Sequence, residues 1–320
     1  MAAKPLVRPP RLARGCRVAL VAPAGPLLER DDIARAEALC RALDYEPRTG
    51  PRAGGHYGYF SGTDEERLAD LNAALRDPAI DAVWCLRGGY GVTRILDGVD
   101  FEALSRRPRP VIGYSDITAL LAAVGRRSGL VTFHGPTARA AMPSFTRRHF
   151  EKVLGLAEPP GRLEPLPTPT DVLLPQAERV VAVCGGRGDG VLAGGNLSLI
   201  QCLVGTPWFP DLDGALLVLE DVGEDLYRID RMLAHLRAIG ALSRLAGVLV
   251  GRFTRCRRHL DDGSLGVDQV LEHYFAPLHI PVMMGLPIGH IDDQWTIPLG
   301  VRARMDAETG TVELLEPAVA

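Results

Sequence analysis

The sequence predicts an α/β protein with an N-terminal doubly wound domain, built on a mostly parallel sheet, and a smaller C-terminal α/β domain that ends in a β-hairpin. Three observations lead to this fold class. Short apolar runs alternate with stretches of helical periodicity from Arg17 to about Leu154, as in a sheet with helices on both faces. Proline then becomes frequent over residues 159–180. Near the end of the chain, two apolar runs flank the turn Glu308-Thr309-Gly310.

The chain of 320 residues exceeds one average domain, so we expect two. We place the N-terminal domain at residues 1–158, a proline-rich linker at 159–180 and the C-terminal domain at 181–320. Thr63, followed three residues later by Glu66, predicts a capping box at the start of a helix. In chain order, the first domain is expected to form a strand, two helices, two strands and a further helix: Val18–Ala22, Asp31–Leu43, Asp64–Leu75, Ala82–Leu86, Val111–Tyr114 and a helix with Ile117, Leu120, Leu121 and Val124 on one face.

The second domain is expected to contain buried strands and at least one amphipathic helix. The apolar run Leu216–Leu219 predicts a strand that ends on Glu220. After it, Leu226, Ile229 and Leu233 recur at helical spacing, as does Leu236. The remaining expected strands, of which the last two form the closing hairpin, are Val180–Val183, Val248–Val250, Val282–Met284, Val301–Met305 and Val312–Leu315.

Composition argues against two classes of partner. The net charge of −3 and a pI near 6.3 provide no concentrated basic surface, which nucleic-acid binding requires. The apolar run Val18–Ala22 follows a basic start, but it is too short for a signal-peptide core or a membrane span. No later segment of spanning length lacks charges. We therefore expect a cytoplasmic protein that binds neither nucleic acid nor membrane.

The cysteines predict neither a metal centre nor a redox motif. The six cysteines form no C-x-x-C pair and no cluster with histidine, so no metal site is expected. Cys40 lies in phase with the apolar face of its helix, and Cys85 lies inside an apolar strand. Both are interpreted as core residues in a reducing compartment.

Unusual residues follow three of the predicted parallel strands, at the edge where doubly wound sheets bind ligands. These strand ends are Ala22-Pro23-Ala24-Gly25, Arg87-Gly88-Gly89-Tyr90-Gly91 and Gly113-Tyr114-Ser115-Asp116. The glycine-rich stretch lacks the lysine of a P-loop and the spacing of a dinucleotide fingerprint. It is equally compatible with a simple tight turn and with a turn that also presents backbone N–H groups to an oxyanion.

Ser115 stands at a strand-to-helix turn, beside the free N–H groups of a helix start. By itself this position is more typical of an N-cap than of a nucleophile. A nucleophilic serine needs a base, and His290, in a loop after Gly289, is the most distinctive histidine, with His134 as its rival. Glu220 is a candidate to orient that base, although it could also begin an acidic helix N-terminus. Most of the other histidines have simpler structural explanations: His149, His235 and His273 fall within helical stretches, and His259 lies in a polar surface segment. The remaining two candidates are His56 and His279.

Several strings of the sequence resemble the LD-carboxypeptidase family of serine peptidases, which includes murein tetrapeptide carboxypeptidases and microcin C self-immunity proteins. The resemblance covers nearly the whole chain, in order. It rests on Gly113-Tyr114-Ser115-Asp116-Ile117-Thr118, Leu219-Glu220-Asp221-Val222 with Tyr227 and Asp230-Arg231, and Gly289-His290 with Pro298-Leu299-Gly300. It extends to Val18–Pro23, Arg87–Gly91, Phe133-His134-Gly135-Pro136 and Gly194-Gly195-Asn196-Leu197.

The resemblance implies a Ser-Glu-His triad in an interdomain cleft, with Ser115 on the first domain and Glu220 and His290 on the second. It implies an oxyanion hole formed by the N–H groups of Gly89 and Asp116. Members of this family act without metal or organic cofactor and form homodimers. The implied role is cytoplasmic murein recycling, with cleavage of the L,D-amide that releases terminal D-alanine from a tetrapeptide. The substrate-binding candidates are Arg87, Gly88, Tyr90 and Arg94, of which the two arginines flank the glycine turn and suit a carboxylate.

Two alternatives remain. The first is a self-immunity peptidase that uses the same triad to hydrolyse aminoacyl or peptidyl nucleotide adducts. The short stretch Gly185–Gly190 contains no tryptophan to stack on a nucleobase, which favours the murein substrate. The second alternative belongs to another class: a non-catalytic two-domain protein that binds a peptide and in which Ser115 is only an N-cap.

Overall fold

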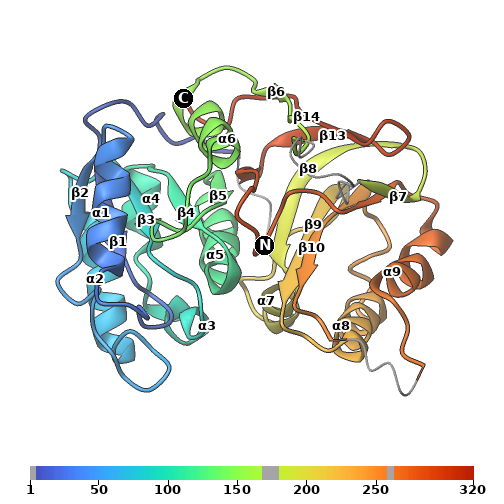
Figure 1. Ribbon diagram of the computed structural model, residues 1–320, viewed down its shortest axis with the longest axis horizontal. Coiled ribbons are helices and arrows are strands. Elements are labelled where there is room, and N and C mark those ends of the chain that lie inside the picture. The colour runs from blue at the N-terminus through green and yellow to red at the C-terminus, as the bar shows by residue number, and fades with distance from the viewer. Residues whose placement is uncertain (1–4, 168–179, 258–262) are drawn as a thin grey trace, which may run out of the picture.

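The computed structural model describes residues 5–167, 180–257 and 263–320. Two β-sheets lie side by side, and each is covered by helices (Figure 1). Segments coloured blue to green form most of the first sheet, and segments coloured yellow to red form most of the second. Most of the predicted linker 159–180 falls on residues 168–179, and His259 falls in 258–262, so these predictions lie outside the described residues.

The first sheet has the strand order β12-β5-β4-β3-β1-β2. Its five strands from the N-terminal part are all parallel, and only β12 (Ile297–Leu299), at the edge, runs antiparallel. The parallel strands place their carboxyl ends along one edge, as the doubly wound prediction requires. They are β1 (Arg17–Val21), β2 (Glu46–Thr49), β3 (Ala82–Cys85), β4 (Val111–Gly113) and β5 (Thr132–His134).

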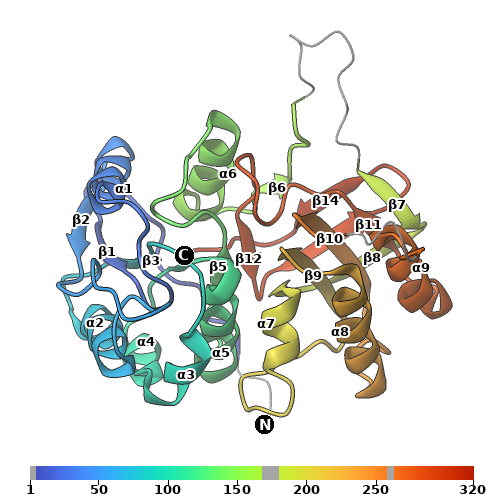
Figure 2. The same cartoon turned by 60° about the horizontal axis from the view of Figure 1, so that its bottom comes forward.

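Helices cover both faces of this sheet, with α1 and α6 on one side and α2 to α5 on the other (Figure 2). The predicted capping box is present at the start of α2: the Glu66 N–H donates to Thr63 Oγ1 at 3.3 Å, and the Thr63 N–H donates to Glu66 Oε2 at 2.9 Å. The helices are α1 (Asp32–Ala42), α2 (Asp64–Arg76), α3 (Val92–Ile95), α4 (Phe101–Arg106), α5 (Thr118–Ser128) and α6 (Ser144–Gly155).

The second sheet has the order β6-β14-β13-β8-β9-β10-β11-β7. Its central strands β8 to β11 are parallel, and the outer strands are antiparallel. The closing hairpin of β13 and β14 confirms the predicted one. The strands are β6 (Gly161–Arg162), β7 (Val181–Cys184), β8 (Arg187–Asn196), β9 (Ala215–Val222), β10 (Gly247–Thr254), β11 (Val282–Met284), β13 (Arg302–Asp306) and β14 (Thr311–Leu314).

The residues of β9 alternate between two apolar cores. Leu216 and Val218 face a core that continues into the first sheet. Leu217 and Leu219 face a second core beneath α7 (Leu197–Cys202), α8 (Leu226–Ala238) and α9 (Val267–Phe275). Because β9 is buried on both sides, its sequence is a continuous apolar run, as expected for a central parallel strand. Two helix-covered sheets with mostly parallel central strands confirm the predicted α/β fold class.

Two pairings join segments that are distant in the sequence. β12 leaves the C-terminal part of the chain and pairs with β5, so a late segment completes the first sheet. β6, which lies within the predicted linker, pairs with β14 of the second sheet. Local periodicity cannot predict either pairing, because the partner strand is far away in the chain.

Among the described residues, no helix is long and apolar enough to cross a membrane, and no group of three or more His, Cys, Asp or Glu side chains is arranged to hold a metal ion. Cys40 and Cys85 are fully buried, as predicted for core residues. Burial raises the pKa of the Cys40 thiol to about 12.

Candidate active site

Ser115 lies immediately beyond the carboxyl end of β4, where the chain turns into a short 3-10 segment (Ser115–Ile117) and then into α5. Its backbone has a φ of 64°, a left-handed conformation that non-glycine residues rarely adopt. The position that caps α5 is Ile117, and no side chain caps either helical segment. Ser115 therefore does not act as an N-cap, and its strained backbone has the geometry of a nucleophile elbow.

The glycine turn after β3 lies directly against Ser115. A Cβ on Gly88 would lie 2.7 Å from the Ser115 Cβ and 2.9 Å from its Oγ, so only glycine allows this approach. The Gly25 N–H donates to the Gly88 carbonyl at 3.1 Å and ties the loop after β1 to the same place. Among the described residues, neither the Gly89 nor the Asp116 N–H is paired with a backbone carbonyl. Both donors are available to an oxyanion.

The side chain of Asp116 points away from solvent and holds two strand ends together. Its Oδ2 accepts a hydrogen bond of 2.9 Å from the Val92 N–H at the start of α3. Burial raises the pKa of this carboxyl to about 6. The backbone of Asp116 thus stays beside Ser115, and its side chain binds the residue that directly follows the glycine turn.

A buried arginine braces the same loops. The Nη1 of Arg67, on α2, donates to the carbonyl of Pro23 after β1 and to that of Gly91 after β3 at 3.0 Å. Its Nη2 pairs with Asp64. Three of the loops that follow parallel strands are therefore cross-linked by polar contacts, which restricts the movement of the glycine turn relative to Ser115.

Glu220, in the second sheet, and His290, in the loop between β11 and β12, form a hydrogen-bonded pair. His290 Nδ1 and Glu220 Oε2 are 2.8 Å apart. Glu220 lies in β9 and is fully buried, whereas the side chain of His290 is 20% exposed. A Cβ on Gly289, whose φ is 112°, would lie 2.6 Å from Glu220 Oε2, so the glycine before His290 lets the loop pass over the carboxylate. A buried carboxylate on Nδ1 leaves Nε2 as the ring nitrogen that can accept a proton.

Asn196 links this pair to the helix that follows Ser115. Its Nδ2 donates to Glu220 Oε1 at 3.2 Å and to Asp221 Oδ1 at 3.0 Å. Its backbone N–H donates to Thr118 Oγ1 at 3.1 Å, at the start of α5. The ring of Tyr114 also contacts His290 edge-on, with centroids 4.8 Å apart. Contacts on both sides of Ser115 therefore bring the three predicted triad residues into one region.

His134, the rival base, lies at the end of β5 and is fully buried. Neither ring nitrogen has a hydrogen-bond partner among the described residues. Burial lowers the pKa of His134 to about 4, so the ring is neutral near pH 7. It lacks the carboxylate partner that His290 has, and its ring packs edge-on against Tyr114 with centroids 6.0 Å apart.

The predicted substrate-binding residues fall into two groups. Arg87 and Gly88 belong to the turn beside Ser115, and the Arg87 Nη1 donates to the Pro26 carbonyl. Tyr90 is 49% exposed and packs against Phe60. Arg94 is exposed and pairs with Asp64, with Nη2 and Oδ2 2.8 Å apart. Both predicted arginines are thus already engaged by groups of the protein.

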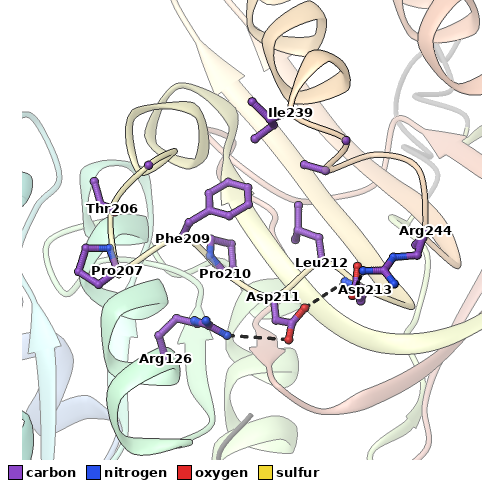
Figure 3. Close-up of a pocket in the computed structure, with 13 residues that line it drawn as sticks. Arg126, Thr206, Pro207, Phe209, Pro210, Asp211, Leu212, Asp213, Ile239 and Arg244 are labelled. Atoms are coloured by element: carbon purple, nitrogen blue, oxygen red, sulfur yellow. Dashed lines mark hydrogen bonds and ion pairs between the residues drawn. The ribbon is translucent and has the colours of Figure 1, made fainter. Parts of the chain in front are cut away.

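A cavity of about 350 Å³ opens beside His290, and residues from both sheets line it. Another cavity, of about 610 Å³, shares no lining residue with it (Figure 3). The arginines that face this second cavity, Arg126 and Arg244, are paired with Asp211 and Asp213 respectively. The candidate active site is therefore the region of the cavity beside His290, because Tyr114, which precedes Ser115 in the chain, lines that cavity together with His290.

Asn196 and Arg67 were not predicted as parts of this region, and Tyr114 was predicted only as a member of the strand end that carries Ser115. Asn196 follows two glycines and precedes an apolar helical run, which is a readable N-cap signal, and it does cap α7. Its contact with Glu220 depends on the pairing of β8 with β9, which no local pattern reveals. The arrangement as a whole can activate a hydroxyl nucleophile and stabilise an oxyanion.

Comparison with known families identifies the family to which the chain belongs. Residues 18–135 match the LD-carboxypeptidase N-terminal domain, and residues 189–305 match the LD-carboxypeptidase C-terminal domain. The protein belongs to the LD-carboxypeptidase family. The two matched regions contain Ser115 and Glu220 with His290, respectively.

Individual relatives of this LD-carboxypeptidase cover nearly its whole length. A putative carboxypeptidase of Streptomyces coelicolor is 40% identical over 98% of each chain. The murein tetrapeptide carboxypeptidase of Pseudomonas aeruginosa is 37% identical over 91% of this chain and 93% of its own. Among solved structures, the microcin C7 self-immunity protein MccF in complex with glutamyl sulfamoyl guanosine superposes with a TM-score of 0.88, covering 99% of this chain and 100% of its own, at 23% identity. The last likeness shows a shared fold.

Proposed function

We propose that this protein is a serine carboxypeptidase that removes the terminal D-alanine from murein tetrapeptides, in cytoplasmic peptidoglycan recycling. Ser115 is the nucleophile, His290 the general base and Glu220 the orienting acid. The observation that carries the proposal is the hydrogen bond between buried Glu220 and His290, held by Asn196 and Tyr114 next to a serine with strained backbone. The relative from Pseudomonas aeruginosa supports the choice of substrate.

In the acylation step, His290 Nε2 takes the proton from Ser115 Oγ as the oxygen attacks the carbonyl carbon of the L-configured residue. The Nδ1–H of the resulting imidazolium donates to Glu220, whose charge stabilises it. The carbonyl oxygen becomes an oxyanion and accepts hydrogen bonds from the N–H groups of Gly89 and Asp116. These two donors belong to the loops after β3 and β4.

The tetrahedral intermediate collapses when His290 returns the proton to the leaving amine. The C–N bond breaks, D-alanine departs and the L-residue remains esterified to Ser115. His290 then deprotonates a water, which attacks the ester carbonyl; the bond between that carbon and Ser115 Oγ breaks, His290 returns the proton to Oγ and the tripeptide is released. No step in this sequence requires a metal or an organic cofactor. We further propose that the enzyme acts as a homodimer.

The test is a hydrolysis assay on the free tetrapeptide L-alanyl-D-glutamyl-diaminopimelyl-D-alanine, with the products measured by mass spectrometry. We expect wild-type protein to release D-alanine and the tripeptide, and the same peptide ending in L-alanine to be a much poorer substrate. Ser115→Ala is expected to abolish turnover while the thermal unfolding transition is kept. Equal hydrolysis of both peptides, or activity that survives Ser115→Ala, would refute the proposal.

An aminoacyl sulfamoyl nucleoside should be measured in the same assay, because the same triad could cleave an aminoacyl nucleotide adduct. MccF, whose fold this chain shares, has been solved with glutamyl sulfamoyl guanosine. The stretch Gly185–Gly190 of this chain contains no aromatic side chain for a nucleobase. Faster cleavage of the nucleoside than of the tetrapeptide would favour the self-immunity activity. Cleavage of neither would favour a non-catalytic binding protein.

A further inference from the structure

We propose that Arg139, assisted by Arg255, binds the free carboxylate of the leaving residue in the cavity beside His290. This inference rests on the proposed function, because it names the recognition group for the substrate's C-terminus. Six residues define the relevant walls of the cavity: Tyr114, Arg139, Arg255, His290, Asp292 and Gln294.

The position of the cavity identifies which part of a substrate enters it. His290 returns a proton to the leaving amine, so the leaving residue lies on the His290 side of the scissile bond. The acyl carbonyl lies on the opposite side, between Ser115 and the N–H groups of the glycine turn. A carboxypeptidase substrate carries a free carboxylate on its leaving residue. The cavity therefore faces a negative charge when substrate is bound.

Arg139 supplies free donors to this cavity. It follows β5 on the first sheet, and its side chain is 29% exposed. Its Nη1 lies 3.3 Å from Asp32 Oδ1 and 3.5 Å from Oδ2, and no other hydrogen bond of its guanidinium is found among the described residues. The remaining N–H groups of the planar guanidinium suit a carboxylate, which binds such a fork in two places.

Asp32 does not pair exclusively with Arg139. This buried carboxylate also accepts the N–H groups of Leu28 and Glu29, and it pairs with Arg35 at 3.1 Å. Asp32 therefore orients Arg139 while its own charge is shared between two arginines. A further anion can bind Arg139 without breaking an exclusive ion pair.

Other positive charges reinforce this site. Arg255, after β10, lines the cavity from the second sheet and makes no ion pair with a described residue. Burial and the neighbouring charge of Arg139 lower the pKa of Arg87. Asp292, the acidic residue of the lining, is exposed. Arg139 and Arg255, one from each half of the molecule, thus line a space in which a carboxylate would neutralise their charge.

The inference changes the earlier expectation for carboxylate binding. Arg94 pairs with Asp64, and Arg87 donates to the carbonyl of Pro26. Neither residue lines the cavity beside His290. We therefore assign carboxylate recognition to Arg139 and leave Arg87 a supporting role through its charge.

The experiment compares two tetrapeptides that differ only at the C-terminus, one with a free carboxylate and one with a carboxamide. Wild-type kcat/KM is expected to favour the acid roughly 10- to 100-fold, as for a charge-assisted hydrogen bond. In Arg139→Gln the preference should fall toward one through loss of activity on the acid, and Arg139→Lys should restore part of it. Arg255→Gln should reduce the preference by a smaller factor because that side chain is exposed.

Arg244→Gln is the matched control, because Arg244 pairs with Asp213 away from the cavity and should leave the preference unchanged. An unaltered preference in Arg139→Gln, with wild-type thermal unfolding, would overturn the inference while leaving the proposed function intact. The case in which the proposed function fails is tested by calorimetric measurement of the binding of both peptides to the Ser115→Ala variant. If wild-type protein hydrolyses neither peptide, the inference stands only if the acid binds more tightly than the amide and Arg139→Gln removes that difference.

Discussion

At the scale of single residues, Ser115 and Asp116 each adopt a conformation or environment that costs free energy. Ser115 has a left-handed backbone that costs about 1–2 kcal/mol for a non-glycine residue, and its hydroxyl is free of any capping role. Asp116, the next residue, keeps a carboxyl 1% exposed and bonded to the Val92 N–H. Packing must therefore stabilise both residues, which is typical of a site in which function, and not stability, selects the geometry.

Asp116 predicts a specific pH dependence of stability. Burial raises its pKa to about 6, from about 3.9 in an unfolded chain, so the folded protein holds this proton more tightly. The resulting stabilisation is complete below pH 4 and is lost as the pH rises through 6, by up to about 3 kcal/mol. In Asp116→Asn, which can still accept from Val92, this loss should be absent.

The check is urea denaturation of both proteins from pH 4 to pH 7.5. The free energy of unfolding of wild-type protein relative to Asp116→Asn should decline across this range. A difference that stays constant with pH would show that Asp116 titrates normally.

At the scale of elements, the loops after parallel strands carry the site. Strands β1, β3 and β4 end beside one another, and Arg67, Gly25 and Asp116 connect the loops that follow them. The loop after β5 adds Arg139 to the same edge. This is the edge at which doubly wound sheets bind ligands, and the pairing of β1 with β3 supplies the point where strand order reverses.

Gly88→Ala should separate positioning from stability. The new Cβ would lie 2.7 Å from the Ser115 Cβ, so the turn or the serine must shift, and a displacement of this kind reduces kcat roughly 100-fold. The control is Gly125→Ala in α5, where a Cβ meets only the Leu130 carbonyl at 3.9 Å. Gly125→Ala should stabilise the helix by about 0.5–1 kcal/mol and leave kcat unchanged. Steady-state kinetics and thermal unfolding check both, and full activity in Gly88→Ala would contradict the geometry of the turn.

The sequence allows prediction of elements whose signal is local. The strand Val282–Met284 and the capping box of α2 are found as predicted, because apolar runs and cap residues act over a few positions. β2 was not predicted because its residues, Glu46–Thr49, are polar or half-buried. β12 includes Pro298, which suits an edge strand, and its pairing with β5 is visible only in three dimensions.

The same distinction applies to the site. Ser115, Glu220 and His290 could be selected because each follows an apolar run or a glycine at a strand end. Asn196 and Arg139 could not, because their importance depends on which distant segment each one faces. Candidate catalytic residues can thus be predicted from the sequence, but the contacts that orient them can be identified only in the folded structure.

At the scale of the whole molecule, the two sheets must keep a fixed relation, because the candidate nucleophile follows a strand of the first sheet and Glu220, which orients the candidate base, lies in the second sheet. Among the described residues, the Asn196 N–H bond to Thr118 Oγ1 joins them near the site. Thr146 Oγ1, on α6, donates to the Asp292 carbonyl, two residues from His290, and so ties the loop that carries His290 to a helix of the first sheet. The strand β12 provides a third connection through the first sheet.

Thr118→Val should weaken the tie beside Ser115. Thr118 is fully buried, so the valine leaves the Asn196 N–H without a partner at a cost of about 1–3 kcal/mol. The shift of Asn196 is expected to disturb Glu220 and to lower kcat more than it raises KM. Thr118→Ser keeps the hydroxyl and is the matched control. Equal kcat in the two variants would argue against a role for this contact in orienting the triad.

The central claim is that Ser115 is a nucleophile activated by His290, which Glu220 of the second sheet orients. Mass spectrometry of the intact protein after incubation with a fluorophosphonate at neutral pH tests it most directly. We predict a single adduct that maps to Ser115 and forms at least about 100-fold more slowly in His290→Ala. No adduct on Ser115, or equally fast labelling in His290→Ala, would contradict the claim.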